Sequence, residues 1–187
     1  MPGARLVLAS RSPQRRAILE QLGVAFDVAP ADVPEIEAGD PAAVALENAL
    51  RKAAATPGRL VLAADTVVAL DGELLGKPRG EEEARAWLRR LAGRTHEVHG
   101  GLALRRDGAT VSATAMTRVT FRPLAAHEAG WYVATGEWRG RAGGYAIQGR
   151  GAALVERIEG DYLNVVGLPL AALMSVAPEL VFGASSP

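Results

Sequence analysis

The feature that most constrains the fold of this chain is an apolar run, Leu60 to Leu70, with a carboxylate at its centre. Five apolar residues precede Asp65, and four follow Thr66. A run of this kind predicts a buried central strand. A carboxylate in such a strand costs roughly several kcal/mol unless hydrogen bonds, a metal ion or a nearby cation compensate it. The sequence therefore predicts a fold organised around a compensated Asp65.

A turn signal follows this run. Asp71-Gly72 is typical of a tight β-hairpin, and the chain then continues to Gly76-Lys77-Pro78. The hairpin would return Lys77 toward the central strand. Lys77 is therefore one candidate for the cation that compensates Asp65.

Composition excludes several classes of protein. The 187 residues fit a single domain, 1–187, and the formal net charge of zero argues against a non-specific nucleic-acid binder. The chain has no cysteine, which excludes disulfides and thiolate chemistry. The N-terminal stretch MPGARLVLAS is too short in its apolar part for a signal peptide, and no apolar run approaches the roughly 18 residues of a membrane span. We expect a soluble, cytoplasmic protein without a membrane partner.

Helix and strand signals are mixed along the chain, which predicts an α/β or α+β architecture with an elongated, partly antiparallel sheet. The helices are expected at 13–22, 41–55, 81–91, 124–134 and 167–176, and the strands at 5–9, 24–28, 60–70, 95–105, 110–122 and 152–159. The tail after Pro178 is expected to be loosely ordered.

The first candidate binding segment is Ser10 to Arg16, where a strand leads into a capped helix. The helix start offers free N–H groups and a partial positive charge, and serine and arginine side chains cluster there. This pattern is suited to binding a phosphate group. An ordinary helix cap with solvated arginines explains it equally well.

Other candidates come from single side chains. Asp65 could hold a metal ion or act as a general base. Glu35, in an acidic loop, could supply an oxygen to magnesium, although a solvated loop is the simpler interpretation. Lys52 follows Asn48 by four residues on one helix face and would ordinarily be solvated. Gln148, in the glycine-rich segment 143–151, could bind a nucleobase edge.

Two histidines make a poor metal pair. His96 and His99 lie three residues apart in a predicted strand, so their side chains point to opposite faces. The sequence also contains no GxSxG, HExxH or P-loop motif.

Five short motifs occur together. They are L-A-S-x-S-P-x-R-R near the N-terminus, A-D-T-V-V in the central run, G-K-P after the hairpin, and A-G-x-Y-x-I-Q-G with V-G-L-P-L late in the chain. In this combination and order the chain resembles the Maf family of nucleoside triphosphate pyrophosphatases. The resemblance implies an elongated mixed sheet with helices on both sides. It also implies two lobes around a nucleotide cleft, as in inosine triphosphate pyrophosphatases, and a homodimer.

The resemblance further implies release of pyrophosphate from a nucleoside triphosphate, with Mg²⁺ or Mn²⁺ as cofactor. By matching motifs, Asp65 occupies the position of the family's proton acceptor. Asp65 and Glu35 also occupy the positions of the family's metal ligands. The residues that fall on phosphate-handling positions are Ser10, Arg15, Lys52 and Lys77, and those on base-selection positions are Thr66, Gln148 and Gln14.

The base-selection positions match one branch of the family only in part. Thr66 and Gln148 resemble the branch that acts on dTTP and UTP, whereas Gln14 stands where that branch usually has arginine. Pro34 stands before Glu35 where an aspartate is usual. Two alternatives stay open at this point. One is a nucleotide-binding regulator of cell division that needs no catalysis, and the other is a pyrophosphatase specific for inosine or modified bases.

Overall fold

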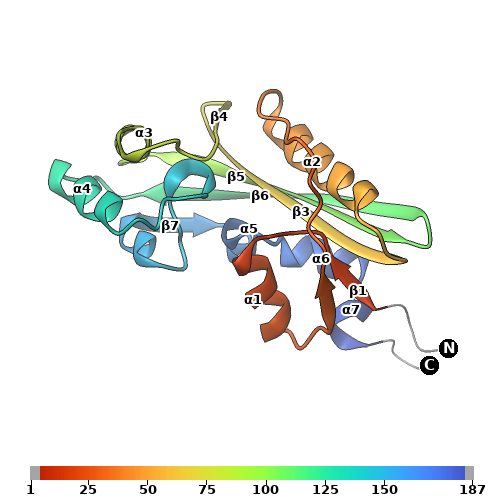
Figure 1. The fold of residues 1–187 in the computed structure, drawn as a ribbon. Coiled ribbons are helices and arrows are strands. Elements are labelled where there is room, and N and C mark those ends of the chain that lie inside the picture. The colour runs from red at the N-terminus through yellow and green to blue at the C-terminus, as the bar shows by residue number, and fades with distance from the viewer. Residues whose placement is uncertain (1–4, 184–187) are drawn as a thin grey trace.

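The fold is built on one open, mixed sheet, seen in a computed structural model that describes residues 5–183 (Figure 1). The strands are β1 (Leu6–Leu8), β2 (Phe26–Val28), β3 (Leu60–Leu70), β4 (Glu73–Leu75), β5 (Thr95–Arg106), β6 (Ala109–Phe121) and β7 (Val155–Glu159). Their order is β2-β1-β3-β5-β6-β7, and β4 pairs with β3 outside this path. The predicted α/β class with an elongated mixed sheet is confirmed.

Helices cover both faces of this sheet. They are α1 (Pro13–Gln21), α2 (Pro41–Ala55), α3 (Glu81–Leu91), α4 (Ala126–Ala134), α5 (Tyr162–Val166), α6 (Leu170–Val176) and α7 (Glu179–Phe182), with 3-10 turns η1 (Ala142–Gly144) and η2 (Arg150–Leu154). Figure 1 shows α2 on one face and α1, α5 and α6 on the other.

The central strand β3 has different neighbours along its length. On one side it pairs with β5 from Leu60 to Ala69. On the other side it pairs in parallel with β1 through residues 60–62 and antiparallel with β4 through residues 68–70. The stretch 63–67 lies between these two pairings, so the sheet has a gap beside the middle of β3.

The predicted hairpin is present. Asp71 and Gly72 have φ values of 54° and 81°, the left-handed conformation that a type I′ turn requires at both positions. The turn brings β4 back against β3 and sets the start of the segment that carries Lys77.

Helix α2 lies very close to the sheet. Its N-terminus is capped by Asp40, whose Oδ1 accepts a hydrogen bond of 2.9 Å from the Ala43 N–H. Gly101 of β5 lies beneath it, and a Cβ on that glycine would come within 2.1 Å of the Ala45 carbonyl oxygen. The missing side chain therefore lets the helix backbone rest directly on the strand.

The hydrophobic core is divided between the two ends of the sheet. One cluster gathers α3, α4 and the strands near them, with Leu88, Phe121 and Tyr132 fully buried. Two others lie around β1, α1, α2 and α6, and include Leu19, Leu62 and Ala49. This division matches the expectation of two lobes.

Some boundaries differ from the sequence prediction. The strand expected from residue 152 begins at Val155, because residues 150–154 form the turn η2, in which the Ala152 N–H bonds the Gly149 carbonyl at 3.1 Å. The helix expected from residue 124 begins at Ala126. The tail expected to be loose contains α7, and α5 was not predicted. The two ends of the domain expected over 1–187 lie outside the described residues.

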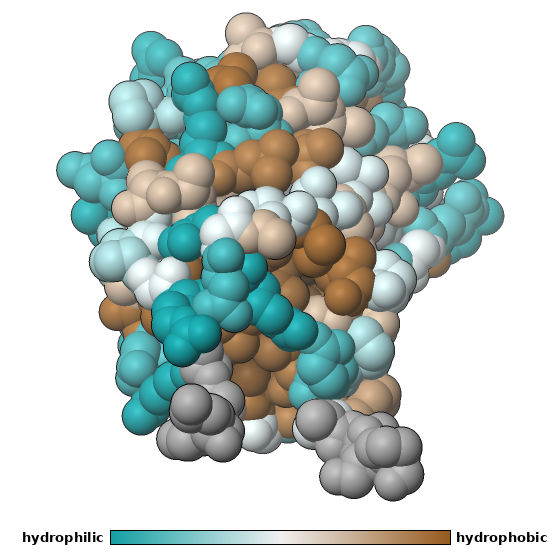
Figure 2. All heavy atoms as spheres, turned by 90° about the vertical axis from the view of Figure 1, so that its right-hand side faces the viewer, coloured by the Kyte–Doolittle hydropathy of each residue, from teal (hydrophilic) through white to brown (hydrophobic). Residues whose placement is uncertain are grey.

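Figure 2 shows the end of the molecule at the right of Figure 1, where hydrophobic residues lie among hydrophilic ones. Large hydrophobic side chains that are exposed include Val111 on β6, Trp131 on α4 and Phe182 on α7. Within residues 5–183, no helix is both long enough and apolar enough to cross a membrane.

Candidate functional site

The gap beside β3 opens into a cavity of about 560 Å³. Its walls come from both lobes: the segment from β1 into α1, the loop before α2, β3 itself, and the segments 139–148 and 165–167. The cavity is lined by all nine residues that the sequence singled out, namely Ser10, Gln14, Arg15, Glu35, Lys52, Asp65, Thr66, Lys77 and Gln148. The structure thus brings together residues that are up to 138 positions apart in the chain, and their chemical roles stay predictions.

Asp65 is compensated, although not by the predicted cation. It is 6% exposed, and its Oδ1 accepts a hydrogen bond of 2.6 Å from Lys52 Nζ. Its Oδ2 accepts a second bond of 3.1 Å from the Asn48 side-chain amide. The candidate from the hairpin, Lys77, instead bonds Glu35. The prediction of a Lys77 partner was wrong because α2, resting on the sheet, brings Lys52 to Asp65.

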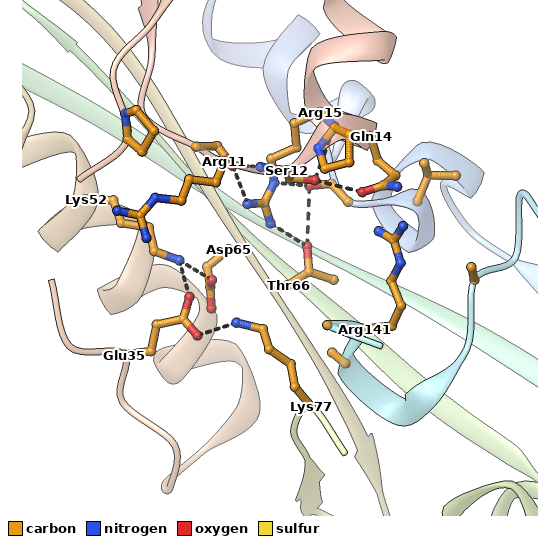
Figure 3. Close-up of a pocket in the computed structure, with 18 of the residues that line it drawn as sticks. Arg11, Ser12, Gln14, Arg15, Glu35, Lys52, Asp65, Thr66, Lys77 and Arg141 are labelled. Carbon is orange, nitrogen blue, oxygen red and sulfur yellow. Dashed lines mark hydrogen bonds and ion pairs between the residues drawn. The ribbon is translucent and has the colours of Figure 1, made fainter. Parts of the chain in front are cut away.

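Lys52 holds two carboxylates at once. Besides Asp65, its Nζ donates to Glu35 Oε1 at 2.7 Å, and the other oxygen of Glu35 accepts from Lys77 Nζ at 2.7 Å. Figure 3 shows these four side chains as one chain of alternating charge. Lys52 is only 9% exposed, so the expectation of a solvated lysine was wrong.

This chain of charges keeps Glu35 ionised. Partial burial alone would raise its pKa, but the hydrogen bonds and positive charges of Lys52 and Lys77 outweigh burial and lower the pKa to about 2. Glu35 is therefore a carboxylate at any pH near neutrality.

Asn48 is a site residue that the sequence prediction did not include. Its amide oxygen accepts the Ile36 N–H at 2.8 Å, and its Nδ2 donates to the Ile36 carbonyl at 3.1 Å as well as to Asp65. It therefore ties the loop that carries Glu35 to α2 and to the central strand. The available signal was its spacing of one helical turn from Lys52, which places both side chains on the same face.

Thr66 lies next to Asp65 but points to the opposite face of the sheet, as successive strand residues do. Its hydroxyl receives a bond of 3.2 Å from Arg15 Nη2. Arg15 also donates from Nε to the Gly167 carbonyl at 2.7 Å and from Nη1 to Ser10 Oγ at 3.0 Å. One guanidinium thus joins α1, β3 and the loop between α5 and α6.

The partners of Arg15 are all neutral oxygens. Its side chain is buried, which lowers its pKa, while the more distant charges of Asp65 and Glu35 raise it. An arginine remains charged even so. The positive charge of Arg15 is therefore held in the cavity wall without direct contact from a carboxylate in the described residues.

The remaining predicted residues lie near the cavity rim. The Gln14 side-chain oxygen accepts a bond of 3.1 Å from Ser12 Oγ, and Ser12 also caps α1. Gln148 is exposed. Its segment is held in place by Tyr132, whose hydroxyl accepts the Ala146 N–H at 2.9 Å. This bond supports the backbone beside Gln148, whose own side chain makes no hydrogen bond within residues 5–183.

A neutral pair lies under the same segment. His96 Nε2 and the Tyr145 hydroxyl are 2.8 Å apart, and Phe121 packs edge-on against both rings. Burial lowers the pKa of His96 to about 4, so the ring is neutral near pH 7. His99, in contrast, bonds Glu97 at 3.0 Å. The two histidines therefore have separate partners.

Comparison with known proteins identifies related chains. The family model described as Maf-like protein matches residues 5–180. A protein from Anaeromyxobacter dehalogenans named dTTP/UTP pyrophosphatase is 51% identical over 173 residues, covering 89% of each chain. Proteins of the same name from Thermus thermophilus and Pyrococcus furiosus are 49% and 44% identical, covering 91% and 92% of this chain and 92% and 93% of their own.

Proposed function

This chain belongs to the Maf-like protein family, and on that premise we propose that it is a nucleoside triphosphate pyrophosphatase that favours dTTP and UTP. The observation that carries the proposal is the buried Asp65, held by Lys52 and Asn48 at the edge of a cavity whose wall includes several lysines and arginines. The names of its relatives supply the substrate class.

In the proposed reaction, Asp65 orients a water molecule and takes its proton as the oxygen attacks the α-phosphorus. The bond from the α-phosphorus to the oxygen bridging to the β-phosphorus breaks, and pyrophosphate leaves with the bonding electrons. The products are the nucleoside monophosphate and pyrophosphate. Lys52 and Asn48 keep the carboxylate fixed in position, which lowers the cost of reorganising it during the reaction.

Positive side chains would bind the phosphates. Lys77 reaches the cavity from beyond the β3–β4 hairpin, and Arg15 reaches it from α1. Preorganised charges of this kind stabilise the negative charge that develops on phosphate oxygens. The helix start after Ser10 adds N–H groups on the same side.

The residues present also fit a divalent cation. Asp65 and Glu35 both bind Lys52 Nζ, so the two carboxylates already converge on one positive charge. Magnesium in nucleotide sites typically takes one or two carboxylates and completes its shell with phosphate oxygens and water. The described residues contain no cluster of three or more metal-ligating side chains, so the substrate would have to complete the shell. When bound, the metal would neutralise charge on the phosphates.

Base selection is assigned to Thr66, Gln14 and Gln148. All three line the cavity, and Gln14 and Gln148 each carry both a donor and an acceptor. A pyrimidine with keto groups can match such amides at its edge. We also propose that the protein is cytoplasmic, as the sequence led us to expect. We further propose that it forms a homodimer, which light scattering would measure.

The proposal is tested with a panel of dTTP, UTP, CTP, 7-methyl-GTP and ITP in Mg²⁺ and in Mn²⁺, with separate assays for pyrophosphate and phosphate. We expect pyrophosphate release, fastest with dTTP and UTP. Dominant release of single phosphate would refute attack at the α-phosphorus. Nucleotide binding with no hydrolysis in either metal would favour the regulatory alternative, and a preference for ITP would favour the other specificity.

A further inference from the structure

An arginine that the sequence did not single out lies in the cavity wall. Arg141 belongs to the segment just before η1, and Figure 3 shows its guanidinium directed into the cavity, beyond Thr66 and across from Lys52. The side chain is half-buried, and its Nε is fully buried without a hydrogen-bond partner.

The other cations of the cavity have partners. Lys52 and Lys77 bond carboxylates at 2.6–2.7 Å. The outer arginines Arg11 and Arg139 lie 3.9 Å from Asp32 and 3.6 Å from Glu81. Arg15 bonds three neutral oxygens. Among residues 5–183, no side chain or carbonyl accepts a hydrogen bond from the guanidinium of Arg141.

A half-buried guanidinium without an acceptor is costly. Burial lowers the pKa of Arg141, while the nearby Tyr132 and Glu137 act in the opposite direction. The Glu137 carboxylate is already bonded to the Arg150 N–H at 2.8 Å. Since arginine stays charged in proteins, an anion bound in the cavity would supply the acceptor that the described residues do not.

We propose that Arg141 binds phosphate oxygens of the triphosphate chain, as a second arginine facing Arg15 from the opposite lobe. This inference rests on the proposed function, since it takes the ligand of the cavity to be a nucleoside triphosphate. The planar fork of arginine suits two oxygens of a phosphate, and the contact is charge-assisted. A phosphate contact of this kind is independent of the nucleobase.

The local structure favours a binding role over a structural one. The backbone of Arg141 is held without the side chain: its N–H bonds the Trp138 carbonyl at 3.2 Å, and its carbonyl accepts the Gly144 N–H at 3.0 Å. Truncating the side chain therefore leaves the segment in place. It also removes a poorly solvated charge, so the ligand-free protein should lose no stability.

The test compares Arg141→Gln and Arg141→Lys with a matched control, Arg118→Gln, which removes an exposed arginine of β6 that lies outside the cavity. Inorganic tripolyphosphate in Mg²⁺ serves as a probe without a base, and its affinity is measured by the ligand-induced rise in Tm. We expect Arg141→Gln to bind it about 10- to 100-fold more weakly, which is the usual size of a hydrogen bond to a charged group. Arg141→Lys should recover part of the loss, and Arg118→Gln should match the wild type.

Kinetics provide the second measurement. We expect Arg141→Gln to raise KM for dTTP, UTP and CTP by the same factor. Wild-type affinity for tripolyphosphate, or a rise in KM confined to one base, would overturn the inference, and the latter would make Arg141 a base-reading residue. A lower Tm of the ligand-free Arg141→Gln variant would also count against it. The binding assay needs no turnover, so a wild type that binds tripolyphosphate yet releases no pyrophosphate would refute the proposed function and leave this inference standing.

Discussion

Two neighbouring residues of β3 face two differently charged halves of the cavity. Asp65 points toward α2, where Lys52, Glu35 and Lys77 form ion pairs of 2.6–2.7 Å. Thr66 points the other way, where Arg15 bonds neutral oxygens only. Figure 3 shows Arg141 on this second side. One half is therefore neutralised before any ligand binds, whereas the arginines of the other half form no ion pair with a carboxylate among residues 5–183.

The difference indicates a division of labour. Carboxylates paired with lysines are fixed in place, which suits a residue that must meet a water molecule in one geometry. Uncompensated arginines gain most from a ligand that brings negative charge. Removing a charge from the two halves should therefore have different consequences, for catalysis and stability on the first side and for binding on the second.

The largest effect is expected from Asp65→Asn. The amide keeps the shape of the carboxylate and removes the base, so turnover of dTTP should fall about 10²-fold or more. Asp107→Asn is the matched control, because Asp107 lies in the exposed β5–β6 turn, where Asn also tolerates the positive φ of 48°. Pyrophosphate release near the wild-type rate by Asp65→Asn would contradict the assignment of the base.

Lys52→Met should destabilise the ligand-free protein by about 3 kcal/mol, because it leaves the buried Asp65 without its cation. Urea unfolding of this variant beside Arg141→Gln tests the comparison directly. The arginine variant should unfold at the wild-type urea concentration. Equal losses in both variants would mean that the two halves are not differently compensated.

Acid should weaken the two halves in different pH ranges. The pKa of His96, under the Arg141 segment, is lowered from 6.5 to about 4, so the unfolded chain binds the extra proton first. The contribution of the neutral His96 to the free energy of unfolding is fully present above pH 6.5. It is lost as pH falls to about 4, and the total loss is about 3 kcal/mol. Glu35, whose pKa is lowered from 4.5 to about 2, contributes stability above pH 4.5 that is lost toward pH 2.

The measurement is urea unfolding of the wild type and of His96→Phe between pH 7 and pH 4. The variant should lose less stability over this range, since it has no imidazole to protonate. Parallel pH profiles for the two proteins would show that His96 does not set the acid sensitivity of this half.

The smallest effect is expected from Lys77→Met. Its side chain is 54% exposed, and solvent screens its ion pair with Glu35, so the free energy of unfolding should fall by less than about 1 kcal/mol. Compared with Lys52→Met, this variant separates the buried part of the charge chain from its exposed end. A loss as large as that of Lys52→Met would mean that the chain acts as one unit.

The sequence predicted much of the fold from local signals. The bounds of α3 agree with the prediction at both ends, and the Asp71-Gly72 turn was recognised from its residue types alone. Nine of the residues that line the cavity had also been singled out, most of them through the short motifs that contain them, and their roles stay predictions. The start of β7 was predicted too early because the glycine-containing segment before it has no periodic pattern.

The partners within the site could not be predicted. Lys52 and Lys77 are both lysines near Asp65 in the fold, and the choice between them depends on how closely α2 approaches the sheet. Asn48 was visible only as a polar residue on the same helix face. Arg141 lies in an irregular segment, so its direction into the cavity required the folded chain.

Gly101 is the cross-strand neighbour of Asp65, and the backbone of α2 occupies the space that a side chain there would need. The distance from Lys52 Nζ to the Asp65 carboxylate therefore depends on Gly101, although Gly101 contacts neither charged group. Even one added methyl would lift the helix and lengthen the 2.6 Å ion pair. The spacing between helix and sheet is thus set at a residue that takes no part in the chemistry, and we expect substitutions of Gly101 to weaken the site from a distance.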